Sequence, residues 1–142
     1  MSQLINSPEE VNDSVENNGF WPALSIAQFK ASTRNDGTVE DSVIAFQLKG
    51  ARLKVNELLR SYQTNEATPP EEGDDIEHLY FEAVYENTKA HLLEMYRDVD
   101  TRDKGHDRAD RMTERVDNCY RNATVAINTI LGNSSRFKVH EL

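Results

Sequence analysis

The densest group of side chains able to do chemistry lies in the segment RDVDTRDKGHDRAD, residues 97–110. Its candidate metal ligands are Asp98, Asp100, Asp103, His106, Asp107 and Asp110. A metal-dependent hydrolase needs two or three such ligands that converge from a rigid frame. Four bases are interleaved with them, and their charges oppose a bound cation: Arg97, Arg102, Lys104 and Arg108. The segment therefore favours a solvated loop with internal ion pairs, and we expect no metal and no cofactor.

The other reactive side chains are isolated from one another. His91 and Glu94 share one helical face, but di-iron bundles repeat a Glu-x-x-His pair on two helices, and this sequence has no such pair. Cys119 falls in an apolar stripe, where it would pack as a small hydrophobe; a nucleophilic role needs an activating base beside it. No Gly-rich phosphate loop and no Gly-x-Ser-x-Gly elbow occurs. We expect no catalytic residue and a protein that is not an enzyme.

Length and composition restrict the class of protein. A chain of 142 residues suits one domain. No apolar run approaches the roughly 18 residues of a membrane span, and the first residues lack the basic-then-apolar order of a secretory signal. One cysteine allows no intrachain disulfide. We therefore expect no membrane partner and assembly in a cytoplasm.

The formal net charge of −9 is distributed unevenly. Residues 1–17 carry four acids and no base, and residues 64–77 carry six acids and no base. Removing these ten acids changes the formal net charge from −9 to +1. The acidity therefore belongs mostly to an arm and a loop, and it opposes tight binding to nucleic-acid phosphates.

Caps and apolar periodicity predict four helices. Ser25 and Gln28 form a capping box at the start of a short helix, and Leu24 with Phe29 forms a hydrophobic staple. Gly50 in the second helix suggests close approach of a neighbouring helix. The predicted helices span residues 26–32, 39–62, 74–98 and 107–131. The apolar stripe of the second consists of Ile44, Leu48, Ala51, Val55, Leu58 and Tyr62, spaced four and three residues apart.

These elements predict an all-α fold. Short links force consecutive helices to run back beside each other, which gives an antiparallel helical bundle of three long helices and one short N-terminal helix. An extended N-terminal arm and an extended C-terminal tail flank it. The predicted parts are a flexible acidic arm over residues 1–17, the helical bundle over 18–133, and the extended tail over 134–142.

Two groups of apolar residues are candidates for protein contacts. Phe20 and Trp21 either pack inside the domain, which avoids an aggregation-prone surface, or form an interface. Phe81 and Tyr85 lie outside the main stripe of their helix, which indicates a second neighbour. The tail alternates apolar residues, as does an extended segment that adds to a partner strand. The candidate interface residues are Phe20, Trp21, Phe81, Tyr85, Arg136, Phe137, Val139 and Leu142.

Five short sequence blocks follow one another in a fixed order along residues 17–142. They are Asn18-Gly19-Phe20 with Pro22, Asp36-Gly37-Thr38-Val39, Val55-Asn56 with Leu58, Tyr96-Arg97-Asp98 with Asp100-Thr101, and Ile130-Leu131-Gly132. Each block is weak alone, whereas five in register are specific. In these residues the chain resembles the head completion protein (GPL) family of contractile-tailed bacteriophages and their prophages.

The resemblance implies a structural virion protein of the head-tail connector. Such a protein binds the portal vertex after DNA packaging, stabilises the filled head and prepares it for tail attachment. The implied partners are the portal protein, tail terminator or neck proteins, and copies of the same chain, by analogy in a ring of twelve. Packaged DNA would pass through the channel without sequence-specific binding. A cytoplasmic helical regulatory or protein-binding module is the alternative function.

Overall fold

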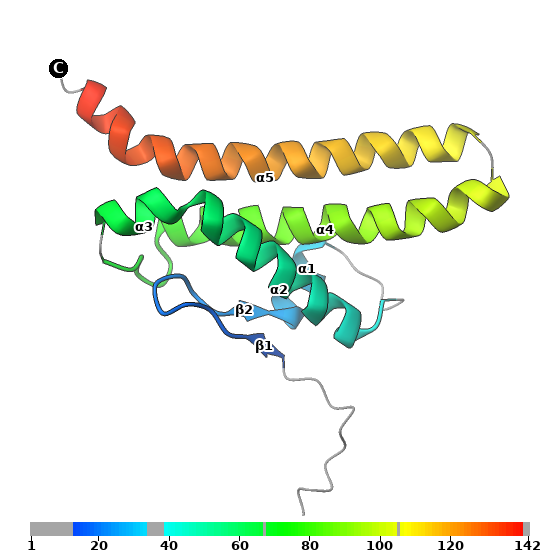
Figure 1. Cartoon of the computed structure of the whole chain (residues 1–142), viewed down its shortest axis with the longest axis horizontal. Coiled ribbons are helices and arrows are strands. Elements are labelled where there is room, and N and C mark those ends of the chain that lie inside the picture. The colour runs from blue at the N-terminus through cyan, green and yellow to red at the C-terminus, as the bar shows by residue number, and fades with distance from the viewer. Residues whose placement is uncertain (1–12, 34–38, 67, 105, 141–142) are drawn as a thin grey trace, which may run out of the picture.

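The computed structural model describes residues 13–33, 39–66, 68–104 and 106–140, with side chains described outside residues 97–109 and 133–140. Two short strands are followed by five helices in this part of the chain (Figure 1). They are β1 (Ser14–Val15), β2 (Leu24–Ser25), α1 (Ile26–Thr33), α2 (Asp41–Leu58), α3 (Arg60–Glu66), α4 (Asp75–Lys104) and α5 (His106–His140). The predicted helical class is confirmed. The predicted set of three long helices and one short helix is not confirmed, because the described residues form five helices and two short strands.

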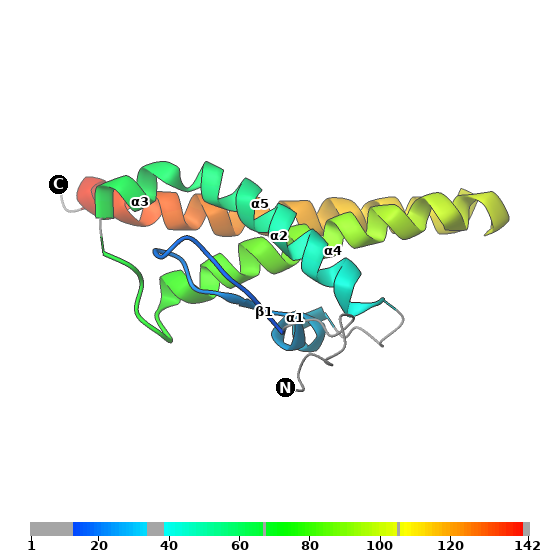
Figure 2. The ribbon, with the colours of Figure 1, turned by 60° about the horizontal axis from the view of Figure 1, so that its bottom comes forward.

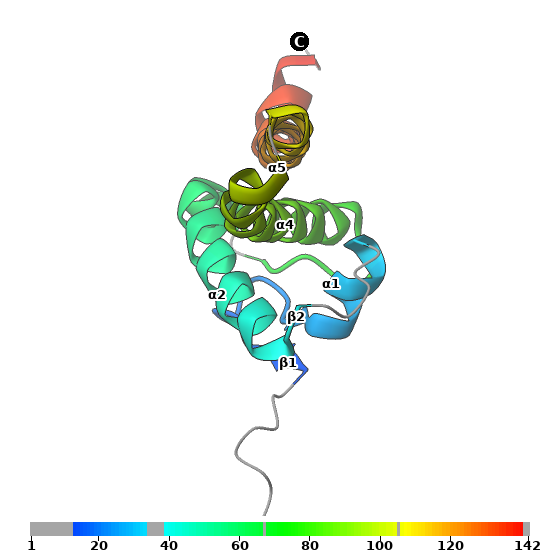
Figure 3. The same cartoon turned by 90° about the vertical axis from the view of Figure 1, so that its right-hand side faces the viewer.

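Helix α4 is the central element of the fold. Figure 3 shows α5 on one side of α4, and α1, α2 and the strand pair on the other side. The α4–α5 hairpin extends past α1 and α2 at the end where α4 stops and α5 begins (Figure 2). The core therefore surrounds α4, and its largest fully buried side chains include Tyr80, Phe29, Leu24, Ile44 and Leu48. A second buried cluster continues along the hairpin and consists of Ala90, Val116 and Cys119.

The predicted helix over residues 39–62 is divided between α2 and α3. Leu59 leaves helical geometry, at φ −100° and ψ 13°, while its N–H still bonds to the carbonyl oxygens of Val55 and Asn56. The leucine that faces the core at this point is Leu59, four residues after the buried Val55. Leu59 is fully buried, whereas Leu58, which the apolar stripe placed inside, is 53% exposed. The buried members of the predicted stripe are Ile44, Leu48, Ala51 and Val55.

Residues 13–17 belong to the folded body, which corrects the predicted flexible arm over residues 1–17. β1 pairs antiparallel with β2, with Ser14 opposite Ser25 and Val15 opposite Leu24. β1 lies against α2 and β2 against α1, on the side of α4 away from α5 (Figure 3). The rest of the predicted arm, residues 1–12, lies outside the described residues.

The amino-terminal end of α1 is capped from two directions. The Ser25 hydroxyl oxygen accepts a hydrogen bond from the Gln28 N–H at 3.0 Å, which confirms the predicted cap. Asp13 adds three further bonds that the sequence did not predict. Its carboxylate accepts from the Ala27 N–H and the Ser25 hydroxyl at 2.8 Å each, and its carbonyl accepts from the Ile26 N–H at 2.9 Å. The α1 terminus therefore holds residue 13 in place.

Helix α5 runs through Gly132 to His140, which corrects the predicted extended tail over residues 134–142. An extended segment needs a partner strand for its backbone N–H and C=O groups, whereas a helix satisfies them internally. No proline interrupts residues 134–140, so the helix continues. For the same reason α4 extends to Lys104, through most of a segment predicted to be a loop.

Gly50 faces solvent on α2, and a Cβ atom built on it meets nothing within 4 Å. The predicted close approach of another helix is therefore wrong. Gly50→Ala is expected to raise the free energy of unfolding by about 0.5–1 kcal/mol, because alanine restricts the unfolded chain and favours the helix. Urea denaturation measures this change. Gly73→Ala is the control: Gly73 has φ +83°, so alanine there should destabilise the chain. A loss of stability in Gly50→Ala would contradict the prediction.

Candidate functional site

Phe20 and Trp21 lie in the core, at 8% and 3% exposure. The Trp21 ring stacks on Tyr80, with centroids 4.5 Å apart and planes inclined by 4°. Tyr62 stacks on Trp21 at 5.7 Å, and Phe20 meets the Trp21 ring edge to face at 4.9 Å. The interpretation as packing within the domain is confirmed, and the alternative placement of these two rings at an exposed interface is wrong. This aromatic cluster fastens residues 20–21 onto α3 and α4.

Three side chains beside the aromatic cluster form a closed ring of hydrogen bonds. The Tyr80 hydroxyl donates to Asn56 Oδ1 at 2.6 Å, and Asn56 Nδ2 donates to Asn17 Oδ1 at 2.9 Å. Asn17 Nδ2 completes the ring by donating to the Tyr80 hydroxyl oxygen at 2.9 Å. Each of the three residues both donates and accepts, so this polar ring satisfies groups that burial would otherwise penalise. It joins the N-terminal segment, α2 and α4.

Tyr85 connects α4 to α1 through its hydroxyl group, as Tyr80 connects α4 to α2. Its hydroxyl donates to Gln28 Oε1 at 2.7 Å and accepts from the Ser25 N–H at 3.2 Å. Its ring is 4% exposed, so Tyr85 is a core residue and not the exposed interface residue that the sequence suggested. Burial raises the pKa of both Tyr80 and Tyr85 to about 12.

The raised pKa values of Tyr80 and Tyr85 predict that the free energy of unfolding falls in strong base. Unfolded tyrosines lose their protons near pH 10, whereas Tyr80 and Tyr85 keep theirs in the folded state to about pH 12. Between those values the unfolded state binds fewer protons, so the free energy of unfolding falls as pH rises. Urea denaturation across this interval measures the fall. A variant with both Tyr80→Phe and Tyr85→Phe should show a shallower fall; an equal fall would contradict the assignment.

The residues considered for catalysis or metal binding pack against neighbouring side chains wherever the structure describes them. His91 meets the Tyr120 ring edge to face at 5.8 Å, and Tyr120 donates to Glu94 at 2.9 Å. Burial, and then the Lys54 charge, lower the pKa of His91. Cys119 packs in the second cluster as predicted, and burial, followed by the Glu86 charge, raises the pKa of its thiol. Among the described side chains no group of three potential ligands could hold a metal ion. The side chains of residues 97–109 lie outside that description.

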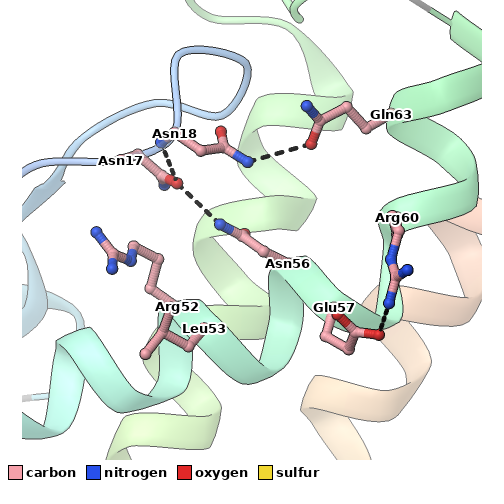
Figure 4. Close-up of a pocket in the computed structure, with 8 residues that line it drawn as sticks. All are labelled: Asn17, Asn18, Arg52, Leu53, Asn56, Glu57, Arg60 and Gln63. Atoms are coloured by element: carbon pink, nitrogen blue, oxygen red, sulfur yellow. Dashed lines mark hydrogen bonds and ion pairs between the residues drawn. The ribbon is translucent and has the colours of Figure 1, made fainter.

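A groove runs along α2 beside the N-terminal segment. It consists of two hollows of about 390 and 430 Å³, both of which Arg52 lines. We call it the α2 groove; its walls are residues 14–18 on one side and α2 with α3 on the other. Figure 4 shows the larger hollow, with Asn17 and Asn18 facing Arg52, Asn56 and Gln63 across it. The α2 and α3 residues of the whole groove are Ala45, Phe46, Lys49, Arg52, Leu53, Asn56, Glu57, Arg60 and Gln63.

Both walls of the α2 groove are held in place. Asn18 Nδ2 donates to Gln63 Oε1 at 3.1 Å, and the Arg52 guanidinium donates to the Glu16 carbonyl oxygen. Asn18 Oδ1 also accepts from the N–H groups of Phe20 and Trp21, at 3.0 and 3.1 Å. Gly19, between Asn18 and Phe20, has φ +89°, a conformation that favours glycine in this turn. The groove is therefore preformed.

The comparison with protein families gives one match that covers nearly all of the chain. The sequence model of the phage head completion protein (GPL) family matches residues 15–70 and 71–141. The chain belongs to this family. No curated protein and no solved structure matches it.

Membership in the head completion family assigns the chain a structural role in phage head assembly, as a virion component that contacts other phage head or tail proteins. The family is structural rather than catalytic. None of the described helices is long and apolar enough to cross a membrane.

Five candidate contact residues of this head completion protein remain untested. Phe81 is half-buried and stacks on Tyr85 at 5.6 Å, so part of its ring packs on the core. Arg136, Phe137 and Val139 lie on the last turns of α5, and their side chains are outside the described set. Leu142 lies outside the described residues altogether.

The α2 groove was not predicted from the sequence. The sequence feature that could have indicated the groove is the pair Phe46 and Leu53, which lie seven residues apart on α2 and outside the buried stripe. Their side chains are 73% and 57% exposed. Spacing of seven places both on one face of a helix. That the N-terminal segment forms the opposite wall depends on Asp13 and Asn17, polar residues whose tertiary partners no local pattern reveals.

Proposed function

We propose that this chain is a head completion protein of the head-tail connector, which binds the portal vertex after DNA packaging, stabilises the filled head and prepares it for tail attachment. The observation that carries this proposal is the family match over residues 15–141. The fold supports it, because an elongated helical body with a preformed groove and a projecting hairpin suits contact with several neighbours.

Copies of the chain assemble head-to-tail in a ring, by analogy of twelve subunits. A ring needs two different surfaces on opposite sides of each subunit. The α2 groove and the outer face of α5 lie on opposite sides of α4 (Figure 3). The α5 surface is free of charge along two turns, as the cores of interfaces commonly are. Its exposed residues there are Asn122, Thr124, Val125, Asn128 and Thr129.

DNA passes through the ring without sequence-specific contacts. The net charge of −9 repels phosphate and disfavours adhesion of the moving genome. A channel that must release DNA quickly on infection benefits from weak contact.

The C-terminal end of α5 contacts the portal protein. In Figures 1 and 2 this end runs past the first turn of α4, so its last turns lack that neighbour. Because the segment is helical, it would dock as a helix in a groove and not as an added strand.

The test uses phage particles assembled without this chain. They are expected to package DNA and then lose it, measured as DNA that becomes sensitive to nuclease. Adding the full chain should restore protection, and a chain that ends at residue 133 should restore much less because it lacks the portal contact. Electron cryo-microscopy of restored particles would count the copies at the neck. Full protection without the chain, or a chain found only in the host cytoplasm, would contradict the proposal; the second result favours a regulatory module.

A further inference from the structure

The α2 groove exposes apolar and cationic side chains side by side. Phe46 is the most exposed of the large hydrophobic residues that the structure describes, at 73%, and Leu53 follows one heptad later. Lys49 lies between them, and Arg52 lines both hollows. Neither cation forms an ion pair with a described residue, whereas Glu57 and Arg60 at the far end pair with each other. The groove therefore offers apolar contacts together with two cations that form no ion pair within the described part of the chain, although Glu16 also lines the smaller hollow.

One wall of the α2 groove contains strand β1. In the described part of the chain β1 pairs only with β2, so its second edge is unpaired, and Ser14, Val15 and Glu16 line the smaller hollow. A strand edge presents backbone N–H and C=O groups that an extended segment can pair with. The geometry thus favours an extended occupant that carries both apolar and acidic side chains over a compact ligand.

We propose that the α2 groove binds residues 1–12 of a neighbouring copy of this chain. This segment, MSQLINSPEEVN, holds the apolar residues Leu4, Ile5 and Val11 and the acids Glu9 and Glu10, with no lysine or arginine. Its acids complement Lys49 and Arg52, and its aliphatic side chains cover Phe46 and Leu53. Twelve extended residues span up to about 40 Å, enough to reach an adjacent subunit. The proposal rests on the proposed function only in requiring neighbouring copies.

The position of Asp13 favours a neighbour over the same chain. The carbonyl and carboxylate of Asp13 are both bonded to the α1 terminus, so the direction of the chain at residue 13 is set. To enter its own groove, the arm would have to reverse within one or two residues of this anchor and run back along β1. Donation to the next subunit needs no such reversal, and it would join copies head-to-tail.

The first test measures binding of a fluorescent peptide of residues 1–12 to the full-length chain by anisotropy. Saturable binding is expected, at least tenfold weaker for a groove variant with Phe46→Asp and Leu53→Asp. Leu58→Asp is the matched control, because Leu58 is a 53% exposed leucine of the same helix that does not line the groove; it should bind like the unmodified chain. A peptide of the same composition in scrambled order should not bind. Equal binding to the groove variant, or none to the unmodified chain, would overturn the proposal.

The second test separates exchange between copies from contact within one chain. An arm variant, Leu4→Asp with Ile5→Asp, keeps an intact groove, and the groove variant keeps an intact arm. Mixing the two is expected to give heterodimers in sedimentation velocity that neither variant forms alone. Absence of the heterodimer despite peptide binding would show that each arm occupies the groove of its own chain, which refutes exchange between copies. If the groove variant lost only its binding to the portal, the groove would be the portal contact, and exchange would again be refuted.

The further inference and the proposed function can fail separately. A neck ring in particles, with no binding of the peptide, would refute arm exchange but not the proposed function. Arm exchange by a chain that is absent from particles would refute only the proposed function.

Discussion

Trp21→Ala is expected to lower the free energy of unfolding by about 3–5 kcal/mol, the range for removing a buried tryptophan. The indole is 3% exposed and stacks on Tyr80 and Tyr62, so alanine would leave a cavity between two helices. Urea denaturation followed by circular dichroism measures the loss, and hydrogen exchange should show that residues 13–25 are released first. Trp21 contributes the largest buried ring among the residues that fix the N-terminal segment to the body.

Two variants sharpen this result. Trp21→Phe should cost less, because it keeps an aromatic ring and removes an indole N–H that has no hydrogen-bond partner among the described residues. Phe46→Ala removes another large ring, but one that is 73% exposed, and should change stability by less than about 0.5 kcal/mol. Normal stability of Trp21→Ala would mean that the ring belongs to an assembly contact.

Tyr80→Phe is expected to lower the free energy of unfolding by about 2 kcal/mol, although only a hydroxyl is lost. That hydroxyl donates to Asn56 and accepts from Asn17, so its removal leaves the Asn56 Oδ1 without this donor and one N–H of Asn17 without its acceptor, while the other N–H still donates to the Pro22 carbonyl oxygen. An unsatisfied buried polar group costs about 1–3 kcal/mol. The measurement is again urea denaturation, read together with Asn56→Ala in a double-mutant cycle.

The cycle distinguishes a cooperative ring from independent bonds. Tyr80→Phe and Asn56→Ala break the same network, so their effects should be less than additive by about 1 kcal/mol or more. Tyr62→Phe is the control, because the Tyr62 hydroxyl makes no hydrogen bond to any described residue and its loss should be nearly neutral. Additive effects would show that the three side chains do not act as one unit.

The aromatic cluster and the polar ring also define what the α2 groove can do. Asn17 belongs to the polar ring and Asn18 holds the turn that delivers Trp21, and both line the groove. The groove is therefore rigid because the N-terminal segment is tied to the core immediately behind it. A binding surface that is ordered before contact avoids the entropic cost of forming on contact. Variants that loosen Trp21 should accordingly weaken assembly as well as folding.

The amino-acid sequence by itself determined the helical class, the approximate positions of most helices and the identity of most core residues. The spacing of Ile44, Leu48, Ala51 and Val55 places them on one face, and all four are buried. The Ser25 cap and the packing of Cys119 were likewise predictable. Each of these depends on residues within one or two helical turns, where a local pattern carries the physical information.

Only the tertiary structure decided the role of the N-terminal segment, the exchange of Leu58 for Leu59 in the core, and the existence of the α2 groove. Asp13 and Asn17 read locally as parts of a solvated arm, yet their hydrogen bonds join residues up to 63 positions apart. The helical tail was mispredicted for a related reason: alternating apolar residues favour a strand only if a partner strand is present. Whether a polar or apolar side chain has a partner depends on what folding brings beside it.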